Sequence, residues 1–157
     1  MSLRIAVTGV PGTGKTTLCN LLEKNGFRIL DLNKEAMKYG CLQNEEVDID
    51  CMKQRIVNDD LIVMDSHYSH LLDPFCVIIT ECSPEILLKR LEARGYDSKK
   101  IDENLDVLLS DAIYQEANES VPGNRIMRSD TDKGINDKDF KQIMDFIRKM
   151  ERKYNGS

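Results

Sequence analysis

The sequence of 157 residues lacks any apolar run close to the roughly 18 residues that a membrane-spanning helix requires. It also lacks an apolar leader, because the charged residue Arg4 stands inside the first strand-like run. We therefore expect no signal peptide and a cytoplasmic protein with no membrane partner. Linkers, internal repeats and low-complexity tracts are missing as well. A chain of this length suits one domain over residues 1–157, which we expect to be a monomer.

Positive charge is also in short supply. The chain has 22 Lys and Arg residues against 27 Asp and Glu residues, which gives a formal net charge of -5. A nucleic-acid footprint needs clustered cations that neutralise phosphates, so we expect no direct contact with nucleic acid. An acidic surface is easier to reconcile with a basic protein partner.

Cysteine-based sites are not indicated by the sequence. The five cysteines are odd in number, form no Cys-x-x-Cys pair and mostly fall in apolar segments. They are Cys19, Cys41, Cys51, Cys76 and Cys82. We interpret them as reduced thiols that pack in the core, in preference to metal ligands or a disulfide.

Short apolar runs alternate with helical patterns along most of the chain. The runs that we expect to be strands are residues 3–8, 27–32, 61–65, 75–82 and 125–128. This alternation is typical of an α/β fold, in which helices cover both faces of a parallel sheet. Ligands of such folds bind at the carboxyl ends of the strands.

Several helices have recognisable ends. Ser-Pro at 83–84 reads as an N-cap and first helical position, and Gly95 ends that helix. Apolar residues recur at helical spacing over 101–113. A last helix is predicted after Ile135 and Asp137, as a hydrophobic staple and a cap.

Two polar stretches interrupt the alternation. Residues 33–60 carry a cluster of carboxylates and a short predicted helix over 51–58, and we interpret them as a lobe inserted between two strands. Residues 94–100, with the sequence RGYDSKK, lie between two predicted helices. They could form a mobile cover over a site.

The segment RIAVTGVPGTGKTTL, residues 4–18, places a glycine-rich turn between a strand and a helix. Gly9, Gly12 and Gly14 permit backbone angles that let successive N–H groups point at one anion. Lys15 and Thr16 complete the P-loop spacing, in which the lysine reaches the β- and γ-phosphates and the hydroxyl ligates Mg²⁺. The start of the helix adds positive potential at the same point. The sequence therefore predicts a nucleotide phosphate site.

Other candidate residues follow the third strand, in the sequence LIVMDSHYSH. Asp65 stands at the strand end, where a carboxylate can hold Mg²⁺ or its water. His67 is close enough to orient a water or assist a proton transfer, and His70 lies one further turn away. Residues of these types at a strand end can also be ordinary caps.

Two arginines on one predicted helix form a further candidate site. Arg90 and Arg94 are four residues apart, so they share a helix face and can grip one anion together or stack on a base. The alternative is a solvated surface pair. The motif of guanine-reading GTPases is not met, because NKEA at 33–36 has Ala where Asp is required. A Ras-like GTPase is therefore disfavoured.

Three segments together resemble a known family. GVPGTGKTT, MDSHYSHLL and CSPEILLKRLEARGYDSKKIDENL, in this order and at these separations, are similar to the adenylate kinase 6 family, also called the coilin-interacting nuclear ATPase type, in its archaeal form. The similarity spans nearly the whole chain. The Asp-x-His and the Arg-Gly-Tyr are more specific to that family than the P-loop is.

The resemblance implies a nucleoside monophosphate kinase fold: a five-stranded parallel sheet, a monophosphate-binding lobe near residues 30–53 and a short lid near 93–103. The implied reaction converts ATP and AMP into two ADP, with Mg²⁺ as the cofactor. The family is also linked to ATP hydrolysis in late maturation of the small ribosomal subunit and its rRNA, through a ribosomal protein of the S11 type.

The resemblance also assigns residues to roles. It gives the binding of the ATP phosphates to Gly12, Gly14, Lys15, Thr16 and Thr17. The metal would lie between the hydroxyl at position 16 and the carboxylate that follows the third strand.

The remaining roles fall on the other two segments. Asp65 and His67 form the family's Asp-x-His, Arg94 is the lid arginine and Arg90 faces the adenine. Lys15, Asp65, His67 and Arg94 would carry catalysis. The loop over 128–134 would hold the adenine through backbone groups.

One position departs from the family pattern. Where the resemblance leads to an arginine in the monophosphate lobe, this chain has Lys34. A lysine offers a point charge without a bidentate grip, so the acceptor phosphate would be held more weakly.

The leading hypothesis is therefore in-line phosphoryl transfer from ATP to AMP, driven by positioning and charge stabilisation. The alternative is an ATPase assembly factor that releases a ribosomal protein and has little kinase activity. A kinase for another small acceptor is a third reading, disfavoured by the Asp-x-His.

Overall fold

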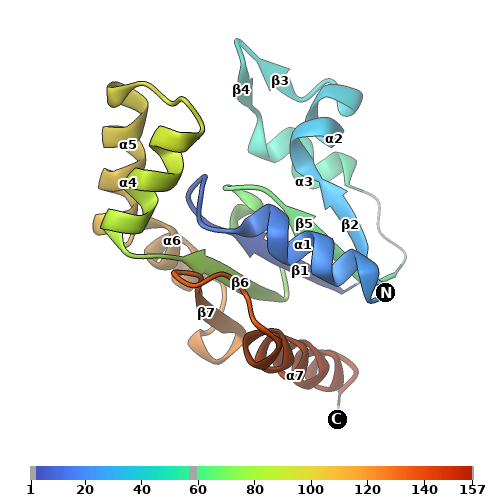
Figure 1. Ribbon diagram of the computed structural model, residues 1–157. Helices are drawn as coiled ribbons and strands as arrows, with labels where there is room; N and C mark the ends of the chain where they lie inside the picture. Colours follow the sequence, from blue (N-terminus) through green and yellow to red (C-terminus); the bar gives the residue numbers. More distant parts are fainter. Residues whose placement is uncertain (1–2, 57–59, 157) are drawn as a thin grey trace.

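A computed structural model describes residues 3–56 and 60–156 and contains a five-stranded parallel sheet (Figure 1). The strand order is β2-β5-β1-β6-β7. The strands are β1 (Arg4–Thr8), β2 (Arg28–Asp31), β5 (Ile62–Asp65), β6 (Cys76–Glu81) and β7 (Ile126–Asp130). Each lies within two residues of its predicted range, and the predicted α/β fold with a five-stranded parallel sheet is confirmed.

Helices cover both faces of the sheet. One face packs against α1 (Lys15–Lys24) and α7 (Asp137–Tyr154), and the other packs against the remaining helices. Those that flank the second face near β6 are α4 (Pro84–Ala93), α5 (Ser98–Leu109) and α6 (Ala112–Ser120). Two short 3₁₀ turns complete the chain, η1 (Ser69–Leu71) and η2 (Gly123–Arg125).

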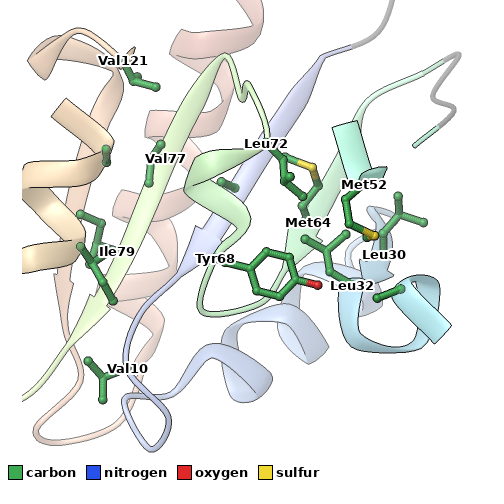
Figure 2. Packing of buried hydrophobic residues seen from close by; sticks show 14 of the residues in the cluster. Val10, Leu30, Leu32, Met52, Met64, Tyr68, Leu72, Val77, Ile79 and Val121 are labelled. Carbon is green, nitrogen blue, oxygen red and sulfur yellow. The ribbon is translucent and has the colours of Figure 1, made fainter. Parts of the chain in front are cut away.

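The apolar strands are continuous in sequence because both sides of the sheet are buried. In β1, Ile5 and Val7 contact the layer under α1 and α7, whereas Ala6 belongs to the opposite layer. That opposite layer is drawn in Figure 2, where Val77 and Ile79 of β6 lie on the same side of the sheet as Tyr68 and Leu72. No helix among residues 3–56 and 60–156 is both long and apolar enough to cross a bilayer.

Parallel pairing brings the carboxyl ends of the strands to one edge of the sheet. Asp31 and Asp65, the last residues of β2 and β5, are paired in register. Thr8, at the end of β1, leads into the glycine-rich loop beside them. The edge predicted to bind ligand therefore carries the loop and two neighbouring carboxylates.

The helix ends differ in detail from the expectations. Ser83 and Pro84 begin α4 as predicted. The apolar stripe over 101–113 is divided between α5 and α6, because Asp111 has a left-handed backbone that breaks the helix. The cap of α7 is Asn136, which forms a capping box with Asp139, so the prediction of Asp137 as the cap was wrong by one residue.

The segment between β2 and β5 forms a helix–hairpin–helix insertion. It contains α2 (Leu32–Tyr39), a hairpin of β3 (Leu42–Gln43) and β4 (Glu46–Val47), and α3 (Ile49–Arg55). The short helix predicted over 51–58 corresponds to α3 but begins two residues earlier. Its predicted end at Asn58 lies outside the described residues.

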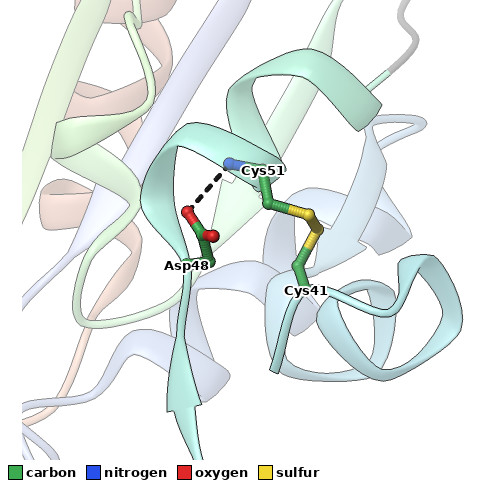
Figure 3. Close-up of a disulfide and its surroundings, with 3 residues drawn as sticks. All are labelled: Cys41, Asp48 and Cys51. Atoms are coloured by element: carbon green, nitrogen blue, oxygen red, sulfur yellow. Dashed lines mark hydrogen bonds between the residues drawn. A yellow bond between two sulfur atoms is a disulfide. The ribbon is translucent and has the colours of Figure 1, made fainter. Parts of the chain in front are cut away.

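A disulfide ties this insertion together. Cys41 and Cys51 are bonded, with Cα atoms 5.6 Å apart, so the prediction that all five cysteines are reduced thiols was wrong for this pair (Figure 3). The hairpin folds the chain back: the Asp48 N–H donates to the Cys41 carbonyl at 2.8 Å, and the Asp48 carboxylate accepts from the Cys51 N–H at 3.1 Å. The other cysteines, Cys19, Cys76 and Cys82, are free and buried, as expected.

Reduction of this disulfide should lower the stability of the oxidised protein. Closing a loop of about ten residues is expected to stabilise the fold by roughly 2–3 kcal/mol, because the cross-link restricts the unfolded chain. We expect a lower urea midpoint for wild-type protein in dithiothreitol than without it. The double variant Cys41→Ser/Cys51→Ser should unfold at the lower midpoint whether or not reductant is present. If the urea midpoint of the wild-type protein is the same with and without dithiothreitol, the Cys41–Cys51 disulfide is contradicted.

Candidate functional site

The glycine-rich loop leaves β1 at a position that only glycine can occupy. Gly9 has φ +154°, and a Cβ atom there would come within 2.6 Å of the Thr80 carbonyl oxygen on β6. Gly14 has φ +99° and begins α1 as its N-cap, in the left-handed region that favours glycine. The loop therefore follows β1 closely beside β6 and turns sharply into a helix whose first residue is Lys15.

Buried threonines hold the loop in place. The Thr13 hydroxyl donates to the Val10 carbonyl at 2.6 Å and lies 2.8 Å from the Thr80 hydroxyl. The Thr131 hydroxyl lies 2.6 Å from the Thr13 carbonyl oxygen. Thr80 lies in β6 and Thr131 directly follows β7. Reasoning from the sequence named the loop over 128–134 but identified neither hydroxyl. These hydroxyls give the loop a fixed shape before any ligand arrives.

Lys15 lies folded over the loop. Its ammonium donates to the carbonyls of Gly9 at 2.8 Å and of Val10 at 3.2 Å. Burial lowers the pKa of Lys15 to about 8, the nearby Asp65 opposes this, and Arg94 adds to it. Phosphate oxygens share a net negative charge. They would therefore bind this largely desolvated ammonium more strongly than the neutral backbone carbonyls do.

Asp65 stands at the end of β5 within the same site. Burial raises the pKa of its carboxyl group, Lys15 opposes this, and the adjacent Asp31 adds to it. The Cys19 thiol on α1 hydrogen-bonds to this carboxylate, and burial is the main reason that the pKa of the thiol is raised. Cys19 is a site neighbour that the sequence reasoning treated only as packing. Its spacing of four residues from Lys15 on one helix is the signal that could have found it.

His67 and Arg94 face Lys15 from two different elements. All three line a cavity of about 240 Å³, together with Thr16, Asp65 and Tyr96. Burial, and then the charge of Lys15, lowers the pKa of His67, so its imidazole is neutral at pH 7. The structure thus brings together the four residues predicted to carry catalysis.

Arg90 lies on the other side of the loop. Its guanidinium donates to the Gly12 carbonyl at 3.1 Å, to the Thr131 hydroxyl at 3.1 Å and to the Thr131 carbonyl. It lines a second cavity of about 250 Å³, with Thr17 and Ile135 among its neighbours. Arg90 therefore joins α4, the loop and the segment after β7, which is the segment predicted to hold the adenine.

A third cavity opens within the insertion. It has a volume of about 540 Å³ and is lined by Met37, Leu42, Val47 and Tyr68, with Asn33 and His67 shared with the first cavity. The first two cavities in turn share Gly12, Gly14 and Arg94. The three cavities are therefore neighbours in a row, with the cavity at the phosphate loop in the middle. In Figure 1 the loop after β1 lies between α4 and α5 on one side and the insertion on the other.

The described side chains do not provide a complete set of metal ligands. Over residues 3–56 and 60–156, no three His, Cys, Asp or Glu side chains converge on one point. Thr16 and Asp65 do line the same cavity, with Asp31 beside them. A hydroxyl and one or two carboxylates suit Mg²⁺, which keeps several waters and takes its other ligands from substrate phosphates. The donor set fits a magnesium ion that arrives with a nucleotide.

His70 does not join the other candidates. It is buried, with 1% of its surface exposed, and lies between the Thr8 hydroxyl at 2.8 Å and the Glu116 carboxylate at 3.0 Å. It lines none of the three cavities described above. The sequence left open a direct contact between His70 and a substrate. In the structure His70 lies away from these three cavities and contacts Thr8 and Glu116 instead.

Comparison with known proteins gives one family and one fold. Residues 5–109 match the family described as “AAA domain”. A “Putative adenylate kinase” of Thermoplasma acidophilum is 47% identical over 125 residues, which are 79% of this chain and 84% of that protein. Another of the same name, from Methanocaldococcus jannaschii, is 36% identical over 73% of this chain and 72% of that protein.

Solved structures resemble this chain in fold. A gluconokinase from Sinorhizobium meliloti superposes with a TM-score of 0.60 at 16% identity, covering 99% of this chain and 97% of that one. A deoxyadenosine kinase from M. mycoides with bound dATP also gives 0.60, at 15% identity over 93% and 99% of the two chains. At such identities the likeness shows the fold alone.

The lowered pKa of Lys15 predicts that nucleotide binding takes up protons at alkaline pH. The free ammonium has a pKa of about 8. Phosphates bound beside it favour the charged form and raise that pKa. At pH 8.5, ADP binding without divalent cations should take up about half a proton or more, and at pH 7.5, where ADP is already almost fully ionised, about a quarter of a proton or less. Calorimetry in two buffers of different ionisation enthalpy measures this.

The control for this measurement is Lys15→Arg, because a guanidinium stays protonated over the whole range. Its binding of ADP, although weaker, should have the same heat in both buffers at pH 8.5. Equal heats for the wild type would contradict the placement of phosphate beside Lys15.

Proposed function

Because the chain belongs to the family of the archaeal proteins named “Putative adenylate kinase”, we propose that it transfers the γ-phosphate of ATP to AMP and forms two ADP. The observation that carries this proposal is the row of three cavities with the phosphate loop at its centre. A single-substrate ATPase needs room for one nucleoside, whereas this row offers room on both sides of the loop. The narrower resemblance, to the coilin-interacting nuclear ATPase type, stays a prediction.

The donor nucleotide would occupy the cavity beside Arg90. Its adenine would lie against Arg90 and Ile135, next to the segment 128–134, and its phosphates would lie on the loop between Gly12 and Thr17. The amides at the start of α1 and the Lys15 ammonium would then replace water around the β- and γ-phosphates.

Magnesium would be held by the Thr16 hydroxyl and the Asp65 carboxylate, directly or through water. When bound, the ion neutralises charge on the β- and γ-phosphate oxygens.

AMP would occupy the side of the insertion, which we assign as the monophosphate-binding lobe, about residues 30–53. The apolar side chains of Met37, Leu42 and Val47 offer a surface for a base. His67 and Asn33, which line both this cavity and the central one, would flank the acceptor phosphate. Lys34 lines neither of these two cavities, but it lines a further one of about 390 Å³ together with Thr16 and Asp65. We assign its charge to the acceptor phosphate on the strength of the resemblance.

The chemistry needs little from the protein beyond placement and charge. An oxygen of the AMP phosphate attacks the γ-phosphorus, and the bond from that phosphorus to the β–γ bridging oxygen breaks. Lys15 and Arg94 would stabilise the charge on the transferred group from two sides. A phosphate monoester has its second pKa near 6, so at neutral pH the attacking oxygen carries no proton and requires no general base. We assign His67 to orienting the acceptor.

A second activity, hydrolysis of ATP, is supported by the short cover over the site. Only residues 94–97 separate α4 from α5, so the proposed lid near 93–103 is a single turn and the first part of α5. Such a lid excludes water less completely than a long one. Release of a basic ribosomal protein of the S11 type by this hydrolysis remains a proposal, supported by the resemblance and by the net charge of -5.

The test of the kinase proposal compares ADP formation from Mg-ATP with and without AMP. We expect a large AMP-dependent rate for the wild type. His67→Ala should reduce the ATP-only rate by at least about tenfold, because attack by water releases a proton that a base must accept. The same variant should reduce AMP-dependent transfer less, since that step needs no base. If AMP adds nothing to the ADP formed from ATP alone, the kinase proposal is wrong and the ATPase alternative stands.

Acceptor affinity should depend on Lys34. Lys34→Arg should lower the KM for AMP by about threefold to tenfold, because a guanidinium can grip a phosphate in bidentate fashion. Lys34→Ala should raise it, with the KM for ATP unchanged in both variants. Lys38→Ala is the matched control, since Lys38 is an exposed lysine on the same helix. An AMP KM that is the same in all four proteins would remove Lys34 from the acceptor site.

A further inference from the structure

The buried histidine of η1 has a role that the reaction itself does not require. We propose that Glu116, His70 and Thr8 form a hydrogen-bonded relay that positions the phosphate loop for ATP, with His70 as a positioning residue. This inference rests on the proposed function only in assigning ATP to the loop. It concerns three side chains that lie outside the cavities.

The relay has a defined direction. The Glu116 carboxylate can only accept hydrogen bonds, so Nε2 of His70, at 3.0 Å, must carry the proton that it donates. In a neutral imidazole Nδ1 is then an acceptor, and the Thr8 hydroxyl at 2.8 Å donates to it. Burial lowers the pKa of His70, although Glu116 opposes this, which favours the neutral ring. Glu116 thus fixes the tautomer, and the tautomer fixes the Thr8 hydroxyl.

Thr8 is the point at which β1 becomes the phosphate loop. The next residue is Gly9, whose carbonyl accepts from the Lys15 ammonium. The Thr8 carbonyl lies 3.3 Å from the Thr80 hydroxyl, which also pairs with Thr13 of the loop. A change in the position of Thr8 would therefore displace the loop both at its entry, next to Gly9, and in its middle, at Thr13.

The turn that carries His70 is itself fastened to β1. The Ser69 hydroxyl donates to the Val7 carbonyl at 2.8 Å. His67, which lies in the central cavity, is three residues from His70 on the same short segment. The relay therefore links α6, on the outside of the sheet, to the two segments that frame the γ-phosphate position.

A histidine that only fills the core would behave differently. Its two hydrogen bonds would contribute to folding, and the loss of either would lower stability without a selective effect on ATP. A relay instead couples Thr8 and Glu116, which lie on opposite sides of the imidazole, so that removal of one partner makes the other ineffective.

A double-mutant cycle separates these cases. We expect Thr8→Val and Glu116→Ala each to weaken the affinity for Mg-ATP by about fivefold, as the loss of one hydrogen bond would. The double variant should also lose about fivefold, instead of the roughly 25-fold that independent effects give. Binding is measured by calorimetry at 25 °C, with folding of each variant checked by circular dichroism. Thr8→Ala replaces Thr8→Val if the latter does not fold.

Conservative variants and a matched control complete the test. Glu116→Gln keeps a side-chain oxygen that accepts from Nε2, so its ATP affinity should stay within about twofold of the wild type. Glu119→Ala, an exposed carboxylate near the end of the same helix, should leave it unchanged. The KM for AMP should be unaffected in every variant. Additive losses, or a Glu116→Gln variant as weak as Glu116→Ala, would overturn the relay.

The outcome for the relay does not depend on the outcome for the kinase reaction. If the wild type forms no AMP-dependent ADP but the cycle in ATP affinity is non-additive, the proposed function fails and the relay stands. If AMP-dependent transfer is found and the losses are additive, the reverse holds.

Discussion

The site depends on one close approach, between Gly9 and the end of β6. The backbone at Gly9 passes so near the Thr80 carbonyl that no side chain fits, and this proximity lets Thr80 reach the loop hydroxyl of Thr13. A loop held by buried hydroxyls loses little conformational entropy when it binds phosphates, because its shape is already fixed. The same approach directs α1 so that its N-terminus points at the ligand edge. Phosphate binding therefore follows from strand packing as much as from the glycine spacing.

Electrostatic balance in the central cavity follows from that geometry. Burial lowers the pKa of the Lys15 ammonium and raises the pKa of the Asp65 carboxyl group. Each favours the charged form of the other, because opposite charges at short range stabilise both. A nucleotide with Mg²⁺, bound as proposed, would bring both an anion for the lysine and a cation for the carboxylate and would favour the charged form of each. A simple anion would supply only the first of these partners.

How far the sequence could predict this protein depends on the distance over which each feature is formed. The five strands and the P-loop were predicted closely because strand burial and glycine spacing act over a few neighbouring residues. The bonds from Thr13 to Thr80 and from Thr131 to Thr13 join residues 67 and 118 positions apart, and no local pattern marks them. The Cys41–Cys51 disulfide was missed for a related reason: a spacing of ten residues means nothing until the hairpin brings the two together. The grouping of Lys15, Asp65 and His67 could be predicted because parallel strands end at one edge. Arg94, at the end of α4, was placed with them only by the resemblance.

The two halves of the site are held by different kinds of interaction. On the donor side the loop, Arg90 and Thr131 are joined by a dense set of hydrogen bonds between segments far apart in the sequence. The insertion is held by the disulfide and by the apolar layer that Leu32 and Met52 share with the sheet. It also offers a lysine where the resemblance leads to an arginine. On the proposed assignment, the ATP side of the site has the larger share of hydrogen bonds between distant segments. On the same assignment, the insertion is the part in which a change of a single residue would alter acceptor preference without loss of the phosphate loop.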